Sequence, residues 1–466
     1  MDYDKSVFLM QLILSKENIK MEKYFKLKEH NTDVRTEIIA GVTTFLSMVY
    51  ILAVNPSILS ASGMDPASIF TATAISAAFG TLLMAFLANY PVALASGMGL
   101  NAYFAFTVCP MVGTDKPWQV ALAAVCVEGI IFILLSFTNF RESLVNDIPQ
   151  NLKSSISVGI GLFIAIIGLK NSGAVSVTTE NGIALGSLAN AAVTLSLVGV
   201  LIIAVFEHFK VKGSIFWGII VTWILGMIAQ AVGWYVPDPE AGVYSVYPTL
   251  AVSGVKLDYF FDFDFAWIGS HVLEFVVIVF SFLYVDIFDT VGTLIGVAEK
   301  ADLLDEDGKL PNAKQALLSD AIATVVGAIC GTSTVTSYVE SSTGAAAGGR
   351  TGLTSVTTGA LFLLSLILSP LFLSIPSFAT TPALVYVGYL MMTQIKSVKF
   401  EDAPLSDIIS AFLAIIMMPF TSSIANGIMF GIVSYIVLKI IEGGAKEIKP
   451  VMWISGVLFI LYMIVG

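Results

Sequence analysis

Apolar residues occur in blocks long enough to cross a membrane, with short polar or Gly/Pro-containing breaks between them. A helix needs about 20 apolar residues to cross the hydrocarbon of a bilayer. The chain therefore predicts seven spans on each side of a long polar and aromatic connection, 234–270. The first seven lie near 38–59, 68–90, 92–108, 117–138, 154–172, 187–206 and 211–233. The second seven lie near 271–298, 313–330, 334–348, 353–375, 380–396, 405–421 and 423–442, and a shorter apolar segment, 451–466, follows.

Composition agrees with this pattern. Hydrophobic residues make up 56% of the chain and charged residues 12%, and the mean hydropathy is +0.87. A soluble globular protein carries about 25% charged residues. We therefore predict an all-α polytopic membrane protein in a lipid bilayer. The net charge of −11 and the lack of a basic stripe argue against a nucleic-acid partner.

The lysine and arginine residues predict the orientation of the spans, because they favour the cytoplasmic side. They precede the first span and follow the fourth, sixth, eighth, tenth, twelfth and fourteenth spans, whereas the connections on the other side carry isolated lysines such as Lys116, Lys170 and Lys256. We expect an even number of spans and two cytoplasmic termini. The segment 1–37 has no signal-peptide cleavage site and is expected to be a cytoplasmic extension.

The third and tenth spans differ from the others. They read "PVALASGMGLNAYFAFTVC" and "TSTVTSYVESSTGAAAGGRTG", are rich in Gly, Ser, Thr and Ala, and occupy matching places in the two halves. Such pairs indicate an inverted-repeat transporter whose substrate site lies near the bilayer midplane. Backbone leaves the helical conformation at membrane depth only where protein or a cavity surrounds it. Close packing of helices through small residues is the alternative interpretation.

Asp286 and Asp289 lie in an otherwise apolar span, "FSFLYVDIFDTVGTLIG". An Asp at the middle of a spanning helix costs about 2.5–3.5 kcal/mol unless it faces protein or water. The two residues are three positions apart and share one helix face. Glu340 lies in the broken tenth span and Asn101 in the broken third span. We expect all four side chains to converge on one cavity, where a buried carboxyl group can exchange a proton near neutral pH.

Other polar residues favour a structural interpretation. Glu128 in the fourth span and Asp320 in the ninth are expected to be packed and hydrogen-bonded, and Glu274 lies at the mouth of the eighth span. The three cysteines and three histidines form no metal-binding spacing, so neither a metal nor a cofactor is expected.

The carboxylates also restrict the ligand. They repel an anion but accept N–H donors, as a neutral planar base or a metal cation would require. A cation transporter of the same fold and a cation channel therefore stay open as alternatives. An anion transporter of the same fold is also an alternative, although the carboxylates count against it. An intramembrane aspartyl protease is disfavoured, because two aspartates on one helical turn cannot flank a peptide bond. We do not expect an enzyme.

Four stretches resemble a known family: "EHNTDVRTEIIAGVTTFLSMVYILAVNP", "ASGMGLNAYFAF", "VDIFDTVGTLIGVAE" and "GTSTVTSYVESSTGAAAGGRTGLT". They are similar to the azaguanine-type purine permeases, a branch of the nucleobase–cation symporters with the uracil permease fold. The likeness runs in order from about Met21 to about residue 445.

The resemblance implies fourteen spans in two inverted repeats of seven. It implies a core domain made of 38–138 and 271–375 and a gate domain made of 154–233 and 380–442, whereas the extra apolar segment, 451–466, departs from the family pattern. It also implies proton symport of hypoxanthine, guanine or adenine into the cell across the plasma membrane. Pairing of two copies through the gate domains is a further expectation.

The resemblance also implies roles for individual residues. Asp286 would hold the base, Glu340 would contribute to substrate binding and proton coupling, and Asp289 would serve proton coupling. Asn101 matches a polar position that is linked to function. The same motifs assign Gly99, Thr336 and Ser341 to the substrate site. In the uracil branch a histidine follows the eighth-span carboxylate by four positions. Thr290 stands there in this chain, so a histidine relay does not carry over.

Overall fold

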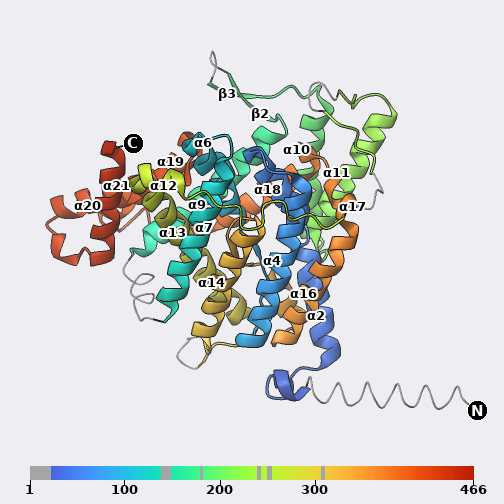
Figure 1. Ribbon diagram of the computed structural model, residues 1–466, viewed down its shortest axis with the longest axis horizontal. Helices are drawn as coiled ribbons and strands as arrows, with labels where there is room; N and C mark the ends of the chain where they lie inside the picture. The colour runs from blue at the N-terminus through green and yellow to red at the C-terminus, as the bar shows by residue number, and fades with distance from the viewer. Residues whose placement is uncertain are drawn as a thin grey trace, which may run out of the picture.

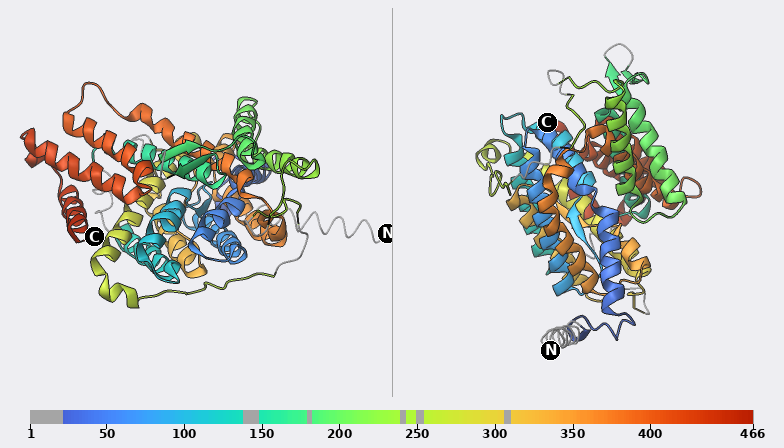
Figure 2. Two further views of the ribbon diagram at one scale, coloured as in Figure 1. Left: turned by 90° about the horizontal axis from the view of Figure 1, so that it is seen from above. Right: turned by 90° about the vertical axis from the view of Figure 1, so that its right-hand side faces the viewer.

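The computed structural model describes residues 22–137, 148–178, 182–238, 243–248, 254–305 and 310–465. Most of the predicted cytoplasmic extension, 1–37, therefore lies outside the described residues. Helices dominate the fold (Figure 1), and they form two groups that lie side by side in the right-hand view of Figure 2.

The first group surrounds two short central strands. Its long helices pack against one another, with α4 against α14 and α16, and α7 against α13 and α14. The members are α2 (Val34–Met48), α3 (Ile51–Leu59), α4 (Pro66–Leu87), α7 (Pro117–Ser136), α13 (Val272–Lys300), α14 (Ala313–Cys330), α16 (Gly352–Ser365) and α17 (Ser369–Leu373).

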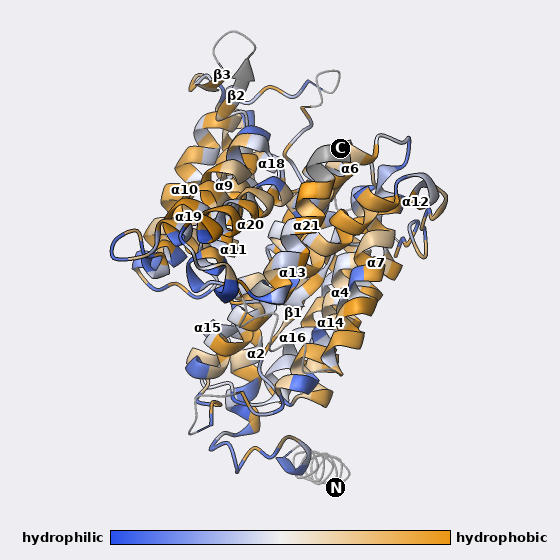
Figure 3. Ribbon diagram, turned by 90° about the vertical axis from the view of Figure 1, so that its left-hand side faces the viewer, coloured by the Kyte–Doolittle hydropathy of each residue, from blue (hydrophilic) through white to orange (hydrophobic). Residues whose placement is uncertain are grey.

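The second group contains six helices that pack mainly against one another, with α9 against α18 and α19, α10 against α11 and α18, and α19 against α20. Figure 3 shows that hydrophobic residues dominate the helices of both groups. The members are α9 (Gln150–Asn171), α10 (Ala191–His208), α11 (Ser214–Ala231), α18 (Ser377–Met392), α19 (Leu405–Thr421) and α20 (Ile424–Ile441).

The strands β1 (Leu94–Ser96) and β4 (Val335–Ser337) form an antiparallel pair at the centre of the first group. Ala95 lies opposite Thr336, and all six strand residues are buried. The pairing supplies hydrogen-bond partners to backbone that would otherwise be unsatisfied inside the membrane. Short helices follow each strand: α5 (Met98–Tyr103), a π-helical turn (Phe104–Val108) and α6 (Cys109–Val112) after β1, and α15 (Ser341–Ala346) after β4.

The predicted spans agree closely with the helices in several places and differ in others. The ninth and thirteenth spans coincide with α14 and α19. The first span begins earlier than predicted, at Val34, and it is interrupted at Val49 and Tyr50 between α2 and α3. Pro56 in α3 has no backbone N–H to donate, which weakens helical bonding in this region.

Nine helices of the described residues are long and apolar enough to cross a membrane. The carboxylate-containing α13 and the shorter α18 and α19 are not among these nine. The third and tenth predicted spans are broken, as their Gly- and Ser-rich sequences indicated, and each consists of a strand and short helices, which the sequence did not predict. The total of fourteen spans stays a prediction.

Three smaller features complete the fold. The strands β2 (Val175–Thr178) and β3 (Gly182–Leu185) form a hairpin, and α12 (Ala266–Ser270) precedes α13. The last helix, α21 (Pro450–Val465), packs against α20 and also against α13, where the Phe459 ring meets the edge of Phe280 at 5.9 Å between centroids.

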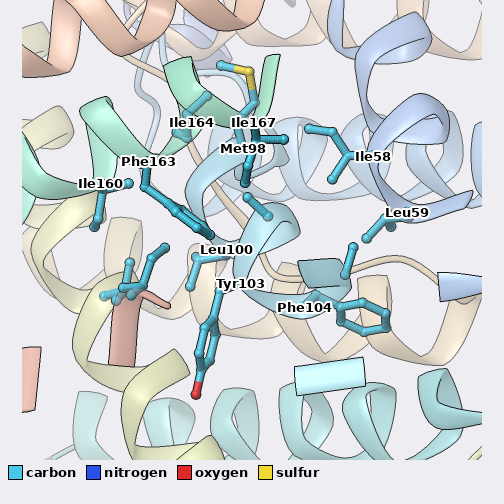
Figure 4. Close-up of a cluster of buried hydrophobic side chains, with 14 of the residues drawn as sticks. Ile58, Leu59, Met98, Leu100, Tyr103, Phe104, Ile160, Phe163, Ile164 and Ile167 are labelled. Atoms are coloured by element: carbon cyan, nitrogen blue, oxygen red, sulfur yellow. The ribbon is translucent and has the colours of Figure 1, made fainter. Parts of the chain in front are cut away.

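Apolar side chains fill the contact between the two groups. Leu100 and Tyr103 of α5 lie opposite Ile160, Phe163 and Ile164 of α9 (Figure 4), and all five are buried. This contact brings the broken third span against the second group of helices.

Candidate functional site

Asp286 lies in the middle of α13 and is fully buried. Its Oδ1 is 3.4 Å from the Thr290 hydroxyl, whereas its Oδ2 has no hydrogen-bond partner among the described residues. The Thr290 hydroxyl is closer to Oδ2 of Asp320 and to the Thr336 hydroxyl, at 2.8 Å each. A hydroxyl has one hydrogen to donate. The Thr290 hydroxyl is therefore at most a weak hydrogen-bond donor to Asp286.

Asp320 is held more firmly than Asp286. Its Oδ1 accepts hydrogen bonds from the Ser337 backbone N–H and from the Ser337 hydroxyl, both at 2.8 Å. Its Oδ2 accepts from Thr290 at 2.8 Å. These donors stabilise a carboxylate and connect α14 to β4 and α13. The hydrogen bonds agree with the structural interpretation of Asp320.

Glu340 lies at the turn between β4 and α15 and is half-buried. Its carboxylate accepts a hydrogen bond from the Tyr50 hydroxyl. Tyr50 occupies the interruption of the first span, so two broken segments from distant parts of the chain meet here. Sequence reasoning missed Tyr50. Pro56 does not mark the interruption, because it lies inside α3 and its missing N–H affects the bond to Leu52 and not to Tyr50.

Asp289 lies one helical turn after Asp286 and is half-buried. It is close enough to Asp320 and Glu340 for electrostatic interaction. Tyr338 is buried beside Asp289 and Glu340, and its hydroxyl donates a 2.5 Å hydrogen bond to the backbone oxygen of Ser96. The carboxylates of α13 and of the tenth segment thus lie around the same strand pair.

Asn101 belongs to a neighbouring network. Its Oδ1 accepts a 3.0 Å hydrogen bond from Ser96, whose hydroxyl is 3.1 Å from that of Thr332. Asn55 of α3 donates to the same Thr332 hydroxyl at 2.9 Å. These contacts hold the broken third segment against α3 and the start of the tenth. Asn101 makes no described contact with the carboxylates.

The remaining predicted site residues divide between two places. Ser341 is buried, and its hydroxyl accepts a 2.9 Å hydrogen bond from the Ala93 backbone N–H. Thr336 is buried in β4, in contact with Thr290. Gly99 instead faces the second group of helices, because a Cβ there would lie 2.8 Å from Cγ2 of Ile160. Gly99 is therefore at the contact between the groups.

We use the name crossing site for Asp286, Asp289, Thr336 and Glu340 beside the β1–β4 pair. Three carboxyl groups and one hydroxyl of this site can accept hydrogen bonds from N–H donors. Within the described residues, no group of three His, Cys, Asp or Glu side chains is placed to hold a metal ion. The arrangement is suited to a polar neutral ligand and to proton exchange.

Comparison with known proteins places the chain in a family. The sequence model of a permease family matches residues 35–446. The chain is 42% identical over 445 residues to the adenine permease AdeP of Escherichia coli, covering 95% of this chain and 96% of that protein. It is 43% identical over 448 residues to the guanine/hypoxanthine permease PbuO of Bacillus subtilis, covering 95% of this chain and all of that protein.

Solved structures share the fold at low sequence identity. The transmembrane domain of the cyanobacterial bicarbonate transporter BicA superposes with a TM-score of 0.63 at 13% identity, covering 85% of this chain and 97% of that one. SLC26A9 gives a TM-score of 0.60 at 12% identity, covering 88% of this chain and 66% of that one. These similarities confirm the predicted inverted-repeat transporter fold.

Proposed function

This chain belongs to the permease family, a family of multi-pass membrane transporters and not of enzymes, and we propose that it imports purine nucleobases by proton symport. The observation that carries the proposal is the identity of 42–43%, over nearly the whole chain, to an adenine permease and a guanine/hypoxanthine permease. The substrates proposed for this chain are adenine, guanine and hypoxanthine.

The crossing site supplies groups that suit a purine. Neighbouring N–H groups of the base would donate to the Asp286 carboxylate, whose Oδ2 is buried without a partner in the described part of the chain. Glu340, oriented by Tyr50, would accept from a second edge of the base. Thr336 and Ser341 would add hydroxyl groups, Asn101 would shape the wall on the β1 side, and Gly99 would let the second group of helices close against that wall.

Proton coupling is assigned to Asp289 and Glu340. Both carboxyl groups are half-buried, so they can exchange protons with water and still interact with the buried groups of the site. Transport would move the first group of helices, as the core domain, against the second group, as the gate domain. We place the protein in the plasma membrane with both termini in the cytoplasm and assign pairing of two copies to the gate domains.

The test uses uptake of radiolabelled adenine and hypoxanthine into a cell that lacks its own purine permeases. Asp286→Asn and Glu340→Gln are expected to abolish uptake, because each removes a charged acceptor for the base and leaves the side-chain size nearly unchanged. Glu274→Gln is the matched control, since Glu274 lies in the first turn of α13 away from the crossing site. Wild-type uptake by both site variants, at equal amounts in the membrane, would refute the site.

Anion transport is the alternative within the same fold, and a bicarbonate transporter shares this architecture. The carboxyl groups of the crossing site disfavour an anion, because like charges repel at close range. An excess of bicarbonate or sulfate is therefore expected to leave purine uptake unchanged, whereas unlabelled purines reduce it. Competition by the anions alone would support the alternative.

A further inference from the structure

Glu128 is a fully buried carboxyl group on α7, and no N–H or hydroxyl donor reaches either of its oxygens among the described residues. The sequence suggested a packed and hydrogen-bonded group; the structure supplies the packing, but the side chain within hydrogen-bonding reach is another carboxyl group, Asp286. A buried charge without donors is strongly unfavourable, so such a group is tolerated when a proton neutralises it. Glu128 therefore needs an explanation beyond packing.

The surroundings of Glu128 are acidic. Asp286 on α13 and Asp320 on α14 are its electrostatic neighbours, and Cys126 lies on the same helix. The π-helical turn Phe104–Val108 and α6 also pack against α7, and Cys109 is the titratable group that they carry. Lysines on the packed helices are confined to the ends, at Lys300 of α13 and Lys314 of α14.

Close packing fixes Glu128 in this position. The next residue, Gly129, lies so near α14 that a Cβ there would be 2.8 Å from Cγ2 of Val325 and 3.0 Å from Cγ2 of Thr324. The helix α7 cannot move away from α14 without opening this contact. Glu128 is thus held close to α14, the helix that carries Asp320.

The three carboxyl groups differ in their hydrogen-bond donors. Asp320 accepts three short hydrogen bonds and is stabilised as a carboxylate. Glu128 has no donor, and Oδ2 of Asp286 has none, among the described residues. Next to a charged Asp320, the pair Glu128 and Asp286 cannot both ionise without strong repulsion. One proton shared by the pair removes this repulsion.

We propose that Glu128 holds the transported proton while Asp286 holds the base, an inference that rests on the proposed function. A purine N–H needs an ionised Asp286 as its acceptor. Binding of the base therefore moves the shared proton from Asp286 to Glu128. Departure of the base to the inside lets the proton return to Asp286 and leave through the half-buried Asp289 and Glu340, and the pair takes up the next proton from outside through the same two groups before the next base binds. One proton then accompanies one base, and no other group changes its covalent bonds.

The experiment uses the full-length protein in liposomes that contain a pH-sensitive dye. Purine entry and acidification of the lumen are measured together, and exchange of labelled for unlabelled adenine is measured separately. Glu128→Gln is expected to retain exchange, because Asp286 and Glu340 are intact. It is expected to lose purine-driven acidification and the pH dependence of uptake, because the amide cannot take the proton. Glu274→Gln is the matched control with wild-type behaviour.

Each outcome decides between interpretations. If Glu128→Gln acidifies the lumen with the wild-type ratio of protons to purine, the inference is overturned. Loss of purine exchange in a folded Glu128→Gln protein would also overturn it, because Glu128 would then serve binding or packing. If Glu128→Gln does not fold, Glu128→Asp is measured. A shifted pH profile with coupling retained supports the inference, and an unchanged profile overturns it. A wild-type protein that moves purine without protons refutes the coupling and this inference, whereas one that moves no purine refutes the proposed function.

Discussion

The Tyr50 hydroxyl donates a hydrogen bond to Glu340, and both residues lie where the chain leaves regular helix. A tyrosine at such an interruption can direct its hydroxyl toward a neighbouring segment while its ring stays buried. Its effect on Glu340 is to restrict the orientation of a carboxylate that would otherwise be mobile in a half-buried position. Tyr50 is in this sense a positioning residue of the crossing site.

Tyr50→Phe tests this role. The substitution removes a hydrogen bond to a charged group, which typically contributes about 1.5–3 kcal/mol, so we expect the KM for purine uptake to rise about tenfold or more. Kinetics of labelled adenine uptake measure the change. Tyr90→Phe is the matched control, because the Tyr90 hydroxyl is buried without a hydrogen-bond partner in the described part of the chain. An unchanged KM in Tyr50→Phe would show that Glu340 needs no help from Tyr50.

At the residue scale, the sequence predicted the positions of the buried acidic residues but not the residues that donate hydrogen bonds to them. Asp286, Asp289 and Glu340 were recognisable because charges are rare in apolar spans. Tyr50 was not, since a tyrosine in an apolar segment is ordinary and its partner lies far along the chain. The donors that distinguish Asp320 from Glu128 come from β4 and α13, so the spacing of residues along the chain carried no signal of them.

Among the elements, α5 lies where the two groups would move past each other, because it follows β1 at the centre of the first group and packs against α9 of the second. Gly99 makes this approach possible, since a Cβ at this position would lie 2.8 Å from Cγ2 of Ile160. A side chain at Gly99 would have to push α5 and α9 apart. The two groups would then no longer meet in the described arrangement.

Gly99→Ala is therefore expected to slow purine uptake, with an overpacking penalty of about 1–3 kcal/mol at this contact. Ile160→Ala removes the clashing Cγ2, so the double variant should recover part of the lost rate, as coupled neighbouring sites do. Initial uptake rates, normalised to protein in the membrane, measure both effects. Gly292→Ala is the matched control, because no atom lies within 4 Å of a Cβ at that helical glycine. Lack of rescue would place the defect away from Ile160.

Helix prediction succeeded where a single hydropathy signal decides the element. The ninth and thirteenth spans coincide with α14 and α19, since polar residues bound both segments clearly. The third and tenth spans were predictable as broken from their Gly and Ser content. Their conversion into paired strands was not, because strand pairing depends on a partner far along the chain and not on local composition.

At the scale of the whole molecule, the transporter combines a group of helices that contains the carboxyl groups of the crossing site with a second group that packs against it and is also built from apolar helices (Figure 3). Proton binding to carboxyl groups within the first group lowers its negative charge. A charged site is costly to move through an apolar surrounding, so protonation favours the step that carries the loaded site across. The proposed coupling thus follows from the separation of the two groups.

Uptake should therefore depend on the proton gradient with a definite sign. Protons bind from outside before the inward step, so a lower outside pH is expected to increase purine accumulation, and a protonophore is expected to abolish it. Replacement of sodium by potassium should leave accumulation unchanged. Labelled hypoxanthine accumulation in whole cells measures all three conditions. Accumulation that follows sodium and ignores the protonophore would contradict proton symport.

The β1–β4 pair has a consequence for biosynthesis. The ribosome releases β1 before the helices α7, α9, α10, α11, α13 and α14 have been made, and β4 follows only after them. Until then the backbone of Leu94–Ser96 has no strand to pair with, so the translocon or water must shield it. The first half of the protein therefore cannot reach its final form during its own insertion. Completion waits for Val335–Ser337, and a chain truncated before β4 should be a target for membrane quality control.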